Sequence, residues 1–187
     1  MNFVFDREKT IAAIGYLAAK GLPELDKYRV CKLLFLADKV HLVKYARPIT
    51  GDTYYAVQYG PIPTNILTLL TAFENNETQL EVVGIEMRGV RPNYKLKNPV
   101  DTSVLSKSDI TVLDKVVDQY GLKSFGELKD LTHDMPAYTK AWNTRPNGLQ
   151  REVMQFEDFF EGEPEAVKGA LARAKEDAEL RKSANAN

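Results

Sequence analysis

The chain has 187 residues, of which 44% are hydrophobic and 27% charged, and its formal net charge is −1. A chain of this length can bury a core of its own without disulfides or metals. Cys31 is the single cysteine, which excludes an internal disulfide and a cysteine cluster for zinc or iron–sulfur. The balanced charge gives no broad basic surface, so nucleic acid is not an expected partner.

The N-terminal residues MNFVFDREKT lack the basic segment and apolar run of a secretion signal, and the sequence contains no apolar stretch of about 20 residues. We therefore expect a cytoplasmic protein without membrane contact.

Two helices are predicted in the first 45 residues. The first follows Asp6 as its cap and ends near Gly21-Leu22-Pro23, where glycine and proline interrupt the pattern. The second runs from Glu24 to about Tyr45, and its apolar side chains occur almost all around the helix. This distribution predicts a buried central helix.

A break at residues 47–52 precedes an aromatic and β-branched segment, residues 54–59, which favours a strand. Residues 60–63 (Gly-Pro-Ile-Pro) are expected to be a second break, followed by an apolar helix through Phe73. Residues 80–85 and 94–96 predict a hairpin, with Gly89 and Pro92-Asn93 in the turn.

Two further helices are expected. Ser106 and Asp109 form a start signal for the first, and the second spans Phe125 to Trp142 with Pro136 breaking or kinking it. The predicted fold class is α+β: mainly helical, with a small antiparallel sheet or hairpin. The order of three helices and a hairpin is similar to that of a winged helix.

The character of the sequence changes near residue 145, which suggests a domain over 1–145 and a C-terminal extension over 146–187. Val167, Leu171, Ala174 and Ala178 form a narrow apolar stripe on a charged helix, and the last five residues are too polar to order themselves. This helix could dock on a partner or on its own domain, where Phe156, Phe159 and Phe160 would anchor it.

The sequence offers little support for catalysis. It has no glycine-rich phosphate loop, zincin motif or serine nucleophile elbow. Asp38 and His41 share a helix face and provide two metal ligands at most, so a histidine bonded to a nearby carboxylate is the preferred interpretation. We read His133-Asp134 as a helix-start cap or structural hydrogen bond, and Cys31 as a buried apolar side chain. No enzyme, metal or cofactor is predicted.

A DNA-binding role has partial support. Arg88, Arg91, Lys95 and Lys97 would give the hairpin a basic face. The helix that would enter the major groove, residues 61–76, has neither lysine nor arginine. Because phosphate attraction dominates DNA affinity, we interpret the basic residues as a solvated strand face.

The loop and strand from Arg47 to Pro61 are predicted to form part of the partner-binding surface, because binding residues concentrate on loops held by a rigid scaffold. The tyrosines of this loop and strand are typical interface anchors, and one of the two alternating strand faces is expected to be exposed. The candidate contact residues are Arg47, Asp52, Tyr54, Tyr55, Tyr59 and Pro61.

Residues 32–38 (KLLFLAD), 45–52 (YARPITGD), Tyr54, Ala56 and Gly60-Pro61, with weaker support from residues 128–133 and Trp142, resemble the Panacea domain, also called the SocA-like antitoxin domain. The resemblance covers about residues 7 to 145, and Ala46 stands where glycine is more usual. The family motif positions are Lys32, Leu33, Asp38, Gly51, Gly60, His133 and Trp142.

The resemblance implies a mainly helical antitoxin that neutralises a genetically paired toxin by direct contact. Toxins of the family include translation inhibitors, notably small alarmone-synthetase-like enzymes, and some relatives are phage-encoded. One branch of the family hands its toxin to a cytoplasmic protease as an adaptor, and some members carry a DNA-binding module. Direct neutralisation is our first hypothesis, and a protease adaptor and a winged-helix-like regulator are the alternatives.

Overall fold

The computed structural model describes residues 1–163, 169–173 and 175–176. The helices and strands, in chain order, are α1 Arg7–Ala19, α2 Lys27–Tyr45, β1 Tyr54–Val57, β2 Gly60–Pro63, α3 Thr64–Glu74, β3 Val83–Arg88, β4 Arg91–Leu96, α4 Lys107–Tyr120, α5 Phe125–His133, α6 Pro136–Thr144, β5 Arg151–Val153 and the 3₁₀ helix η1 Phe156–Phe160. The predicted class, mainly α with small antiparallel sheets, is confirmed.

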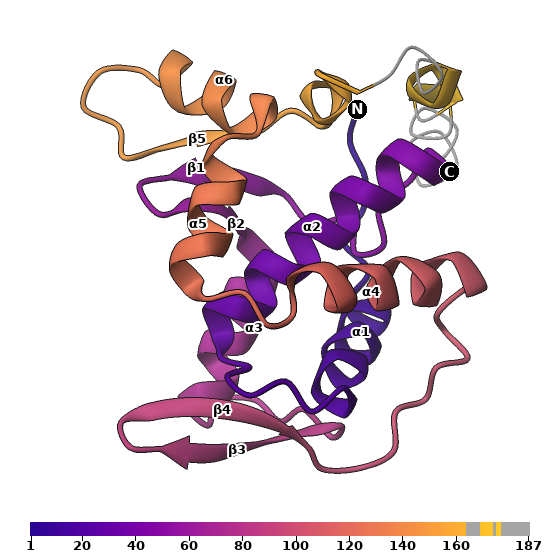
Figure 1. Cartoon of the computed structure of the whole chain (residues 1–187), viewed down its shortest axis with the longest axis vertical. Coiled ribbons are helices and arrows are strands. Elements are labelled where there is room, and N and C mark those ends of the chain that lie inside the picture. Colours follow the sequence, from indigo (N-terminus) through magenta and orange to yellow (C-terminus); the bar gives the residue numbers. More distant parts are fainter. Residues whose placement is uncertain (164–168, 174, 177–187) are drawn as a thin grey trace.

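Helix α2 lies at the centre of the molecule, as the sequence predicted. It packs against α1, α3, α4, α5, β2 and η1, and it crosses the middle of the view in Figure 1. Thirteen of its residues are buried, which accounts for apolar side chains on nearly every face. Asp26 caps its first turn by accepting a hydrogen bond from the backbone N–H of Arg29, so the helix begins three residues later than predicted.

A three-stranded antiparallel sheet has the order β2-β1-β5. Residues 60–63 form strand β2, so the prediction of a simple break there is wrong. Pro61 pairs with Ala56 and Pro63 with Tyr54. The strand tolerates two prolines because it lies at the edge of the sheet, where a missing N–H costs no ladder bond on the outer side.

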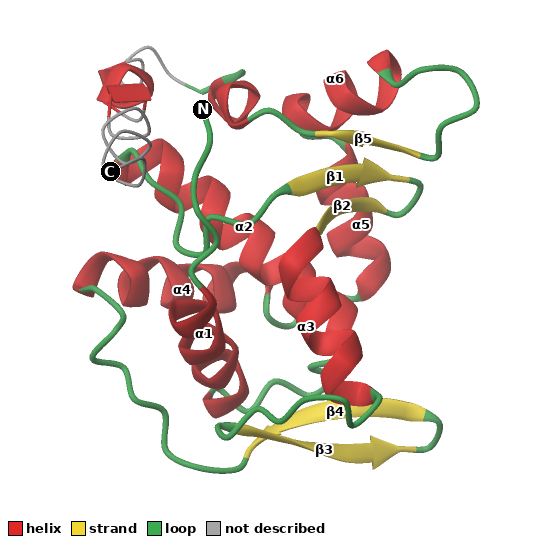
Figure 2. Cartoon of the chain, turned by 180° about the vertical axis from the view of Figure 1, so that it is seen from behind, coloured by secondary structure: helices red, strands yellow, loops and turns green. Residues whose placement is uncertain are grey.

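Strands β3 and β4 form a separate hairpin at the opposite end of the molecule from the three-stranded sheet (Figure 2). Its turn is at Gly89, with φ +62°, and Val90. Pro92 and Asn93, which were predicted in the turn, lie inside β4. Asn93 is buried there, and its side-chain oxygen accepts a hydrogen bond from the N–H of Leu25. This tertiary contact outweighs the turn preference of the Pro-Asn pair.

The predicted helix starts in the second half of the chain are confirmed. Ser106 and Asp109 form a capping box on α4, and Ser124 and Glu127 form one on α5. Pro136 divides the predicted helix of residues 125–142 into α5 and α6, because it occupies the first position of α6, where no N–H is needed.

Residues 151–160, beyond the family resemblance, contribute to the core. Strand β5 pairs with β1, and the buried rings of Phe156 and Phe159 pack edge-on or tilted against Tyr54. Of the predicted apolar stripe, Val167, Ala174 and Ala178 lie outside the described residues. Leu171 lies in a described helical stretch, where the neighbouring Ala170 is buried.

Within residues 1–163 and the short described stretches beyond them, no helix is long and apolar enough to cross a membrane. The same part of the chain contains no group of three or more side chains arranged to hold a metal ion.

Candidate functional site

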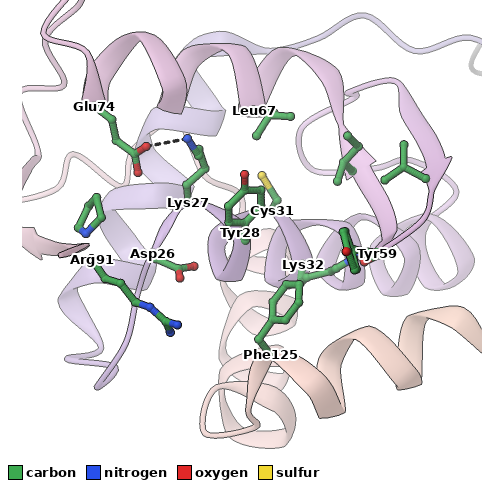
Figure 3. Close-up of a pocket in the computed structure, with 13 residues that line it drawn as sticks. Asp26, Lys27, Tyr28, Cys31, Lys32, Tyr59, Leu67, Glu74, Arg91 and Phe125 are labelled. Atoms are coloured by element: carbon green, nitrogen blue, oxygen red, sulfur yellow. Dashed lines mark hydrogen bonds and ion pairs between the residues drawn. The ribbon is translucent and has the colours of Figure 1, made fainter. Parts of the chain in front are cut away.

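A groove of about 810 Å³ runs along the N-terminal half of α2, and it is the candidate functional site (Figure 3). Helix α3 forms one wall, the β1–β2 turn closes one end, and α5 and β4 complete the lining. The lining residues are Asp26, Lys27, Tyr28, Cys31, Lys32, Val57, Tyr59, Ile62, Leu67, Glu74, Arg91, Pro92 and Phe125. The volume falls within the range of ligand pockets, so several partner side chains could enter.

The hairpin end of the groove is polar. Lys27 donates a 2.7 Å hydrogen bond to Glu74, and the hydroxyl of Tyr94 donates to the second oxygen of the same carboxylate. Asp26 is engaged as the cap of α2. Arg91, by contrast, is exposed and forms no ion pair or side-chain hydrogen bond with the described residues. Both acidic side chains at this end thus accept internal hydrogen bonds, whereas Arg91 has no partner within the described part of the chain.

Three exposed aromatic rings border the middle and the other end of the groove. Tyr59 is 60% exposed, Tyr28 51% and Phe125 43%. The rings of Tyr28 on α2 and Phe125 on α5 pack edge to face, with their centroids 6.5 Å apart. Aromatic side chains of this kind are enriched among the residues that dominate protein interfaces.

Lys32 lies under the β1–β2 turn and is buried. Its ammonium donates hydrogen bonds of 2.8 Å and 3.0 Å to the carbonyl oxygens of Tyr59 and Pro61. None of the described carboxylates forms an ion pair with it. Burial without a negative partner lowers the pKa of Lys32 to about 7. The lysine therefore holds the turn that carries Tyr59, although burial disfavours its charged form.

Gly60 makes this close contact possible. Its φ is +89°, and a Cβ atom there would lie 2.5 Å from Nζ of Lys32 and 2.9 Å from Oγ1 of Thr132. His133 lies next to the same point, 3.1 Å from the virtual Cβ. The motif positions Lys32, Gly60 and His133, which are far apart in the sequence, are thus one cluster behind the groove.

Asp38, six residues further along α2, holds a different loop. Its carboxylate accepts hydrogen bonds from the N–H groups of Ile49 and Thr50 and from the hydroxyls of Thr50 and Tyr54. Burial raises the pKa of Asp38, although these donors act in the opposite direction. The side chain is therefore a structural anchor for residues 49–54.

Other motif positions are also structural. Gly51 has φ +68°, and a Cβ there would lie 2.3 Å from the carbonyl oxygen of Val4. Leu33 is fully buried in the core. Trp142 stacks on Tyr138, and the guanidinium of Arg145 covers its ring at 3.7 Å.

Of the predicted partner-binding residues, Tyr59 is the one whose side chain is mostly exposed. Tyr59 lies at the groove, and Tyr55 is half-buried with Arg151 over its ring. Tyr54 is buried, so the strand has one buried and one outward tyrosine face, as its alternation predicted. Pro61 is buried beside Lys32.

Arg47 and Asp52 have structural partners. The guanidinium of Arg47 binds Asp109 at 3.0 Å and the hydroxyl of Ser106. Asp52 is fully buried and caps α3, accepting hydrogen bonds from the N–H groups of Asn65 and Ile66. A partner could reach Asp52, Tyr54 or Pro61 only if the fold opened, so we leave these three out of the proposed contact surface.

The residues considered for catalysis are packed in the structure. His41 contacts the Arg47 carbonyl oxygen through Nδ1, and its Nε2 lies 3.0 Å from Asp109. Its carboxylate neighbour is thus Asp109 rather than Asp38. Burial raises the pKa of Asp109, yet His41, the Ser106 N–H and Arg47 outweigh it and hold the pKa well below its usual range.

Cys31 is buried, and this burial raises the pKa of its thiol, so the thiolate is disfavoured. Asp134 is at the C-terminal end of α5, so the helix-start cap, one of the two alternatives for His133-Asp134, is wrong. The ring of His133 stacks on Tyr138 with centroids 4.4 Å apart. Burial and the nearby Lys32 lower the pKa of His133.

Comparison with known proteins identifies the family. The model described as "Antitoxin SocA-like, Panacea domain" matches residues 30–139. The chain belongs to this family. The matched Panacea domain includes Lys32 and Asp38 of α2, the β1–β2 turn and ten of the thirteen groove residues. No curated protein and no solved structure matches the chain.

Sequence reasoning missed most of the groove of this Panacea domain. Tyr28, Leu67 and Phe125 fit the apolar patterns of three helices, and that pattern cannot separate a groove wall from a core contact. In the sequence, Arg91 is one of four basic residues of the predicted hairpin, and nothing there links it to a groove. Exposure of an aromatic ring is decided by the packing of neighbouring helices, so the sequence carried no direct signal.

Proposed function

We propose that this protein is an antitoxin that neutralises a cognate toxin by direct, stoichiometric protein contact in the cytoplasm, without catalysis. The observation that carries the proposal is the match of residues 30–139 to the SocA-like Panacea antitoxin family. The family resemblance favours a translation-inhibiting toxin, including the alarmone-synthetase-like class.

The groove supports contact as the means of neutralisation. Ten of its thirteen lining residues lie inside the matched region, and it presents three exposed aromatic rings on a scaffold of packed helices. A rigid scaffold with aromatic anchors lowers the entropic cost of ordering the interface. The ionisable groups at Asp38, His41 and Asp109 are engaged in internal bonds, which agrees with a role in folding.

The experiment is co-expression with the product of the adjacent gene, measuring growth, co-purification and the cellular level of that product. Direct neutralisation predicts restored growth, a stable complex and an unchanged toxin level. Restored growth with toxin loss that depends on a cytoplasmic protease would support the adaptor alternative. Repression of the promoter without a complex would support a regulator.

The non-catalytic part of the proposal has its own test. His133→Gln should leave neutralisation substantially intact, because binding requires occupancy rather than proton transfer. A folded variant that still binds the toxin but no longer protects cells would contradict a non-catalytic mechanism.

A further inference from the structure

At the hairpin end of the groove, one exposed charged side chain has no partner among the described residues. Glu74 is bonded through both oxygens, to Lys27 and Tyr94. Asp26 accepts from the α2 backbone. Arg91 remains without a carboxylate or a hydrogen-bond acceptor among the described side chains. Asp26 keeps its negative charge but is half-buried, so the exposed charged group that an incoming partner meets at this end, among the described residues, is the guanidinium of Arg91.

The middle of the groove is apolar and bordered by aromatic rings. Cys31, Ile62 and Leu67 line it, and Tyr28, Tyr59 and Phe125 stand exposed around it. Figure 3 shows Arg91 and Tyr59 on opposite sides of the groove, with Phe125 between them. A complementary partner would bring apolar side chains to the middle and an acidic side chain to the Arg91 end.

We infer that the groove binds an apolar segment of the toxin whose carboxylate pairs with Arg91, with Tyr59 and Phe125 packing on its apolar side chains. This inference rests on the proposed antitoxin function and names the surface and the chemistry of the toxin segment. Lys32 is a positioning residue in it, because its ammonium fixes the turn that presents Tyr59.

A second copy of the chain fits the groove less well. The most exposed apolar side chains of the chain include Met87 and Val90 at the tip of the β3–β4 hairpin. Arg88 and Arg91 flank this tip, so a second copy would bring like charge to Arg91, and this costs free energy. A toxin segment with acidic side chains avoids the repulsion.

The test uses the full chain and the product of the adjacent gene as the binding probe. Arg91→Glu and Tyr59→Ala should each weaken the affinity about tenfold or more, without a change in melting temperature, because both side chains are exposed. The matched controls are Lys115→Glu, an exposed cation on α4, and Leu149→Ala, an exposed apolar side chain outside the groove. These controls should stay within about twofold of the unsubstituted protein.

Charge-reversal rescue identifies the pairing. Toxin variants selected to bind the Arg91→Glu protein should carry Lys or Arg in place of a surface Asp or Glu, and they should not rescue Tyr59→Ala.

Unaltered affinity of both groove variants, with neutralisation by the wild type intact, would overturn the inference and leave the proposed function standing. Loss of a homodimer in sedimentation, with toxin affinity unchanged, would assign the groove to self-association. Failure of the wild-type chain to bind or neutralise would instead reject the proposed function.

Discussion

Asp38 and Lys32 are both buried charged side chains on α2, but they are compensated very differently. Four donors from residues 49–54 surround the carboxylate of Asp38. Lys32 has two carbonyl acceptors and no described carboxylate partner. Helix α2 therefore holds residues 49–54 through a carboxylate that accepts four hydrogen bonds. It holds the β1–β2 turn through a buried ammonium whose charge no described carboxylate balances. This ammonium, of Lys32, lies beside the groove.

The largest expected effect is at Asp38. Asp38→Ala should lower the free energy of unfolding by roughly 3 to 5 kcal/mol, because several buried donors lose their acceptor at about 1 to 3 kcal/mol each. Urea unfolding measures the loss. Asp118→Ala, the same change on an exposed face of α4, should alter stability by less than about 0.5 kcal/mol. Equal small effects would show that the Asp38 anchor is dispensable.

Gly60→Ala tests how tightly the Lys32 cluster is packed. The variant should lose about 2 to 4 kcal/mol, because positive φ disfavours alanine and the new Cβ collides with Nζ of Lys32. Gly89→Ala is the matched control, since Gly89 also has positive φ but no atom within 4 Å of the virtual Cβ. Thermal or urea unfolding should show a loss of about 1 kcal/mol there. If the two losses are equal, the contact with Lys32 contributes nothing.

Lys32→Met should change how stability depends on pH. The pKa of Lys32 is about 7 in the folded protein and about 10.4 in an unfolded chain. Between pH 7 and about 10.4, Lys32 binds a proton more fully in the unfolded state than in the folded state. Its contribution to the free energy of unfolding therefore increases as pH rises.

The Lys32 contribution is obtained as wild-type minus variant stability, which removes the titration of the other groups common to both proteins. This difference should increase from pH 7 to 9.5 by up to about 1.4 kcal/mol per pH unit. A difference that stays constant over the range would show that Lys32 keeps an ordinary pKa when folded.

The smallest expected effect is at one donor to Asp38. Tyr54→Phe should cost about 1 kcal/mol, because the carboxylate keeps three other hydrogen bonds. Tyr55→Phe on the outward face is the control, since no described group is hydrogen-bonded to the Tyr55 hydroxyl, and it should have almost no effect. A larger loss at Tyr55 would reverse the assignment of the two strand faces.

Local rules predicted the helices well. The cap at Asp6, the capping box at Ser106 and Asp109, and the break at Pro136 are short-range signals that depend on neighbouring backbone groups, and the structure confirms each. The all-round apolar pattern of α2 also identified the central helix, because only a helix contacted on every side can bury it.

The small strands were predicted less well. Strand β5 has three residues in a polar stretch, and it is paired with β1, about a hundred residues earlier in the chain. Strand β2 contains two prolines that locally indicate a break. In both cases pairing with a distant strand decided the outcome, and such pairing is not visible in a window of sequence.

The sequence by itself determined the helical class, the position of α2, and the motif residues by which the chain resembles its family. Only the tertiary structure decided that Asp52 and Tyr54 are buried, that Lys32, Gly60 and His133 meet, and that Tyr59 and Phe125 border one groove. The physical reason is range: caps and periodicity depend on residues within a few positions. Burial and the shape of a groove depend on side chains that come together only when the helices pack.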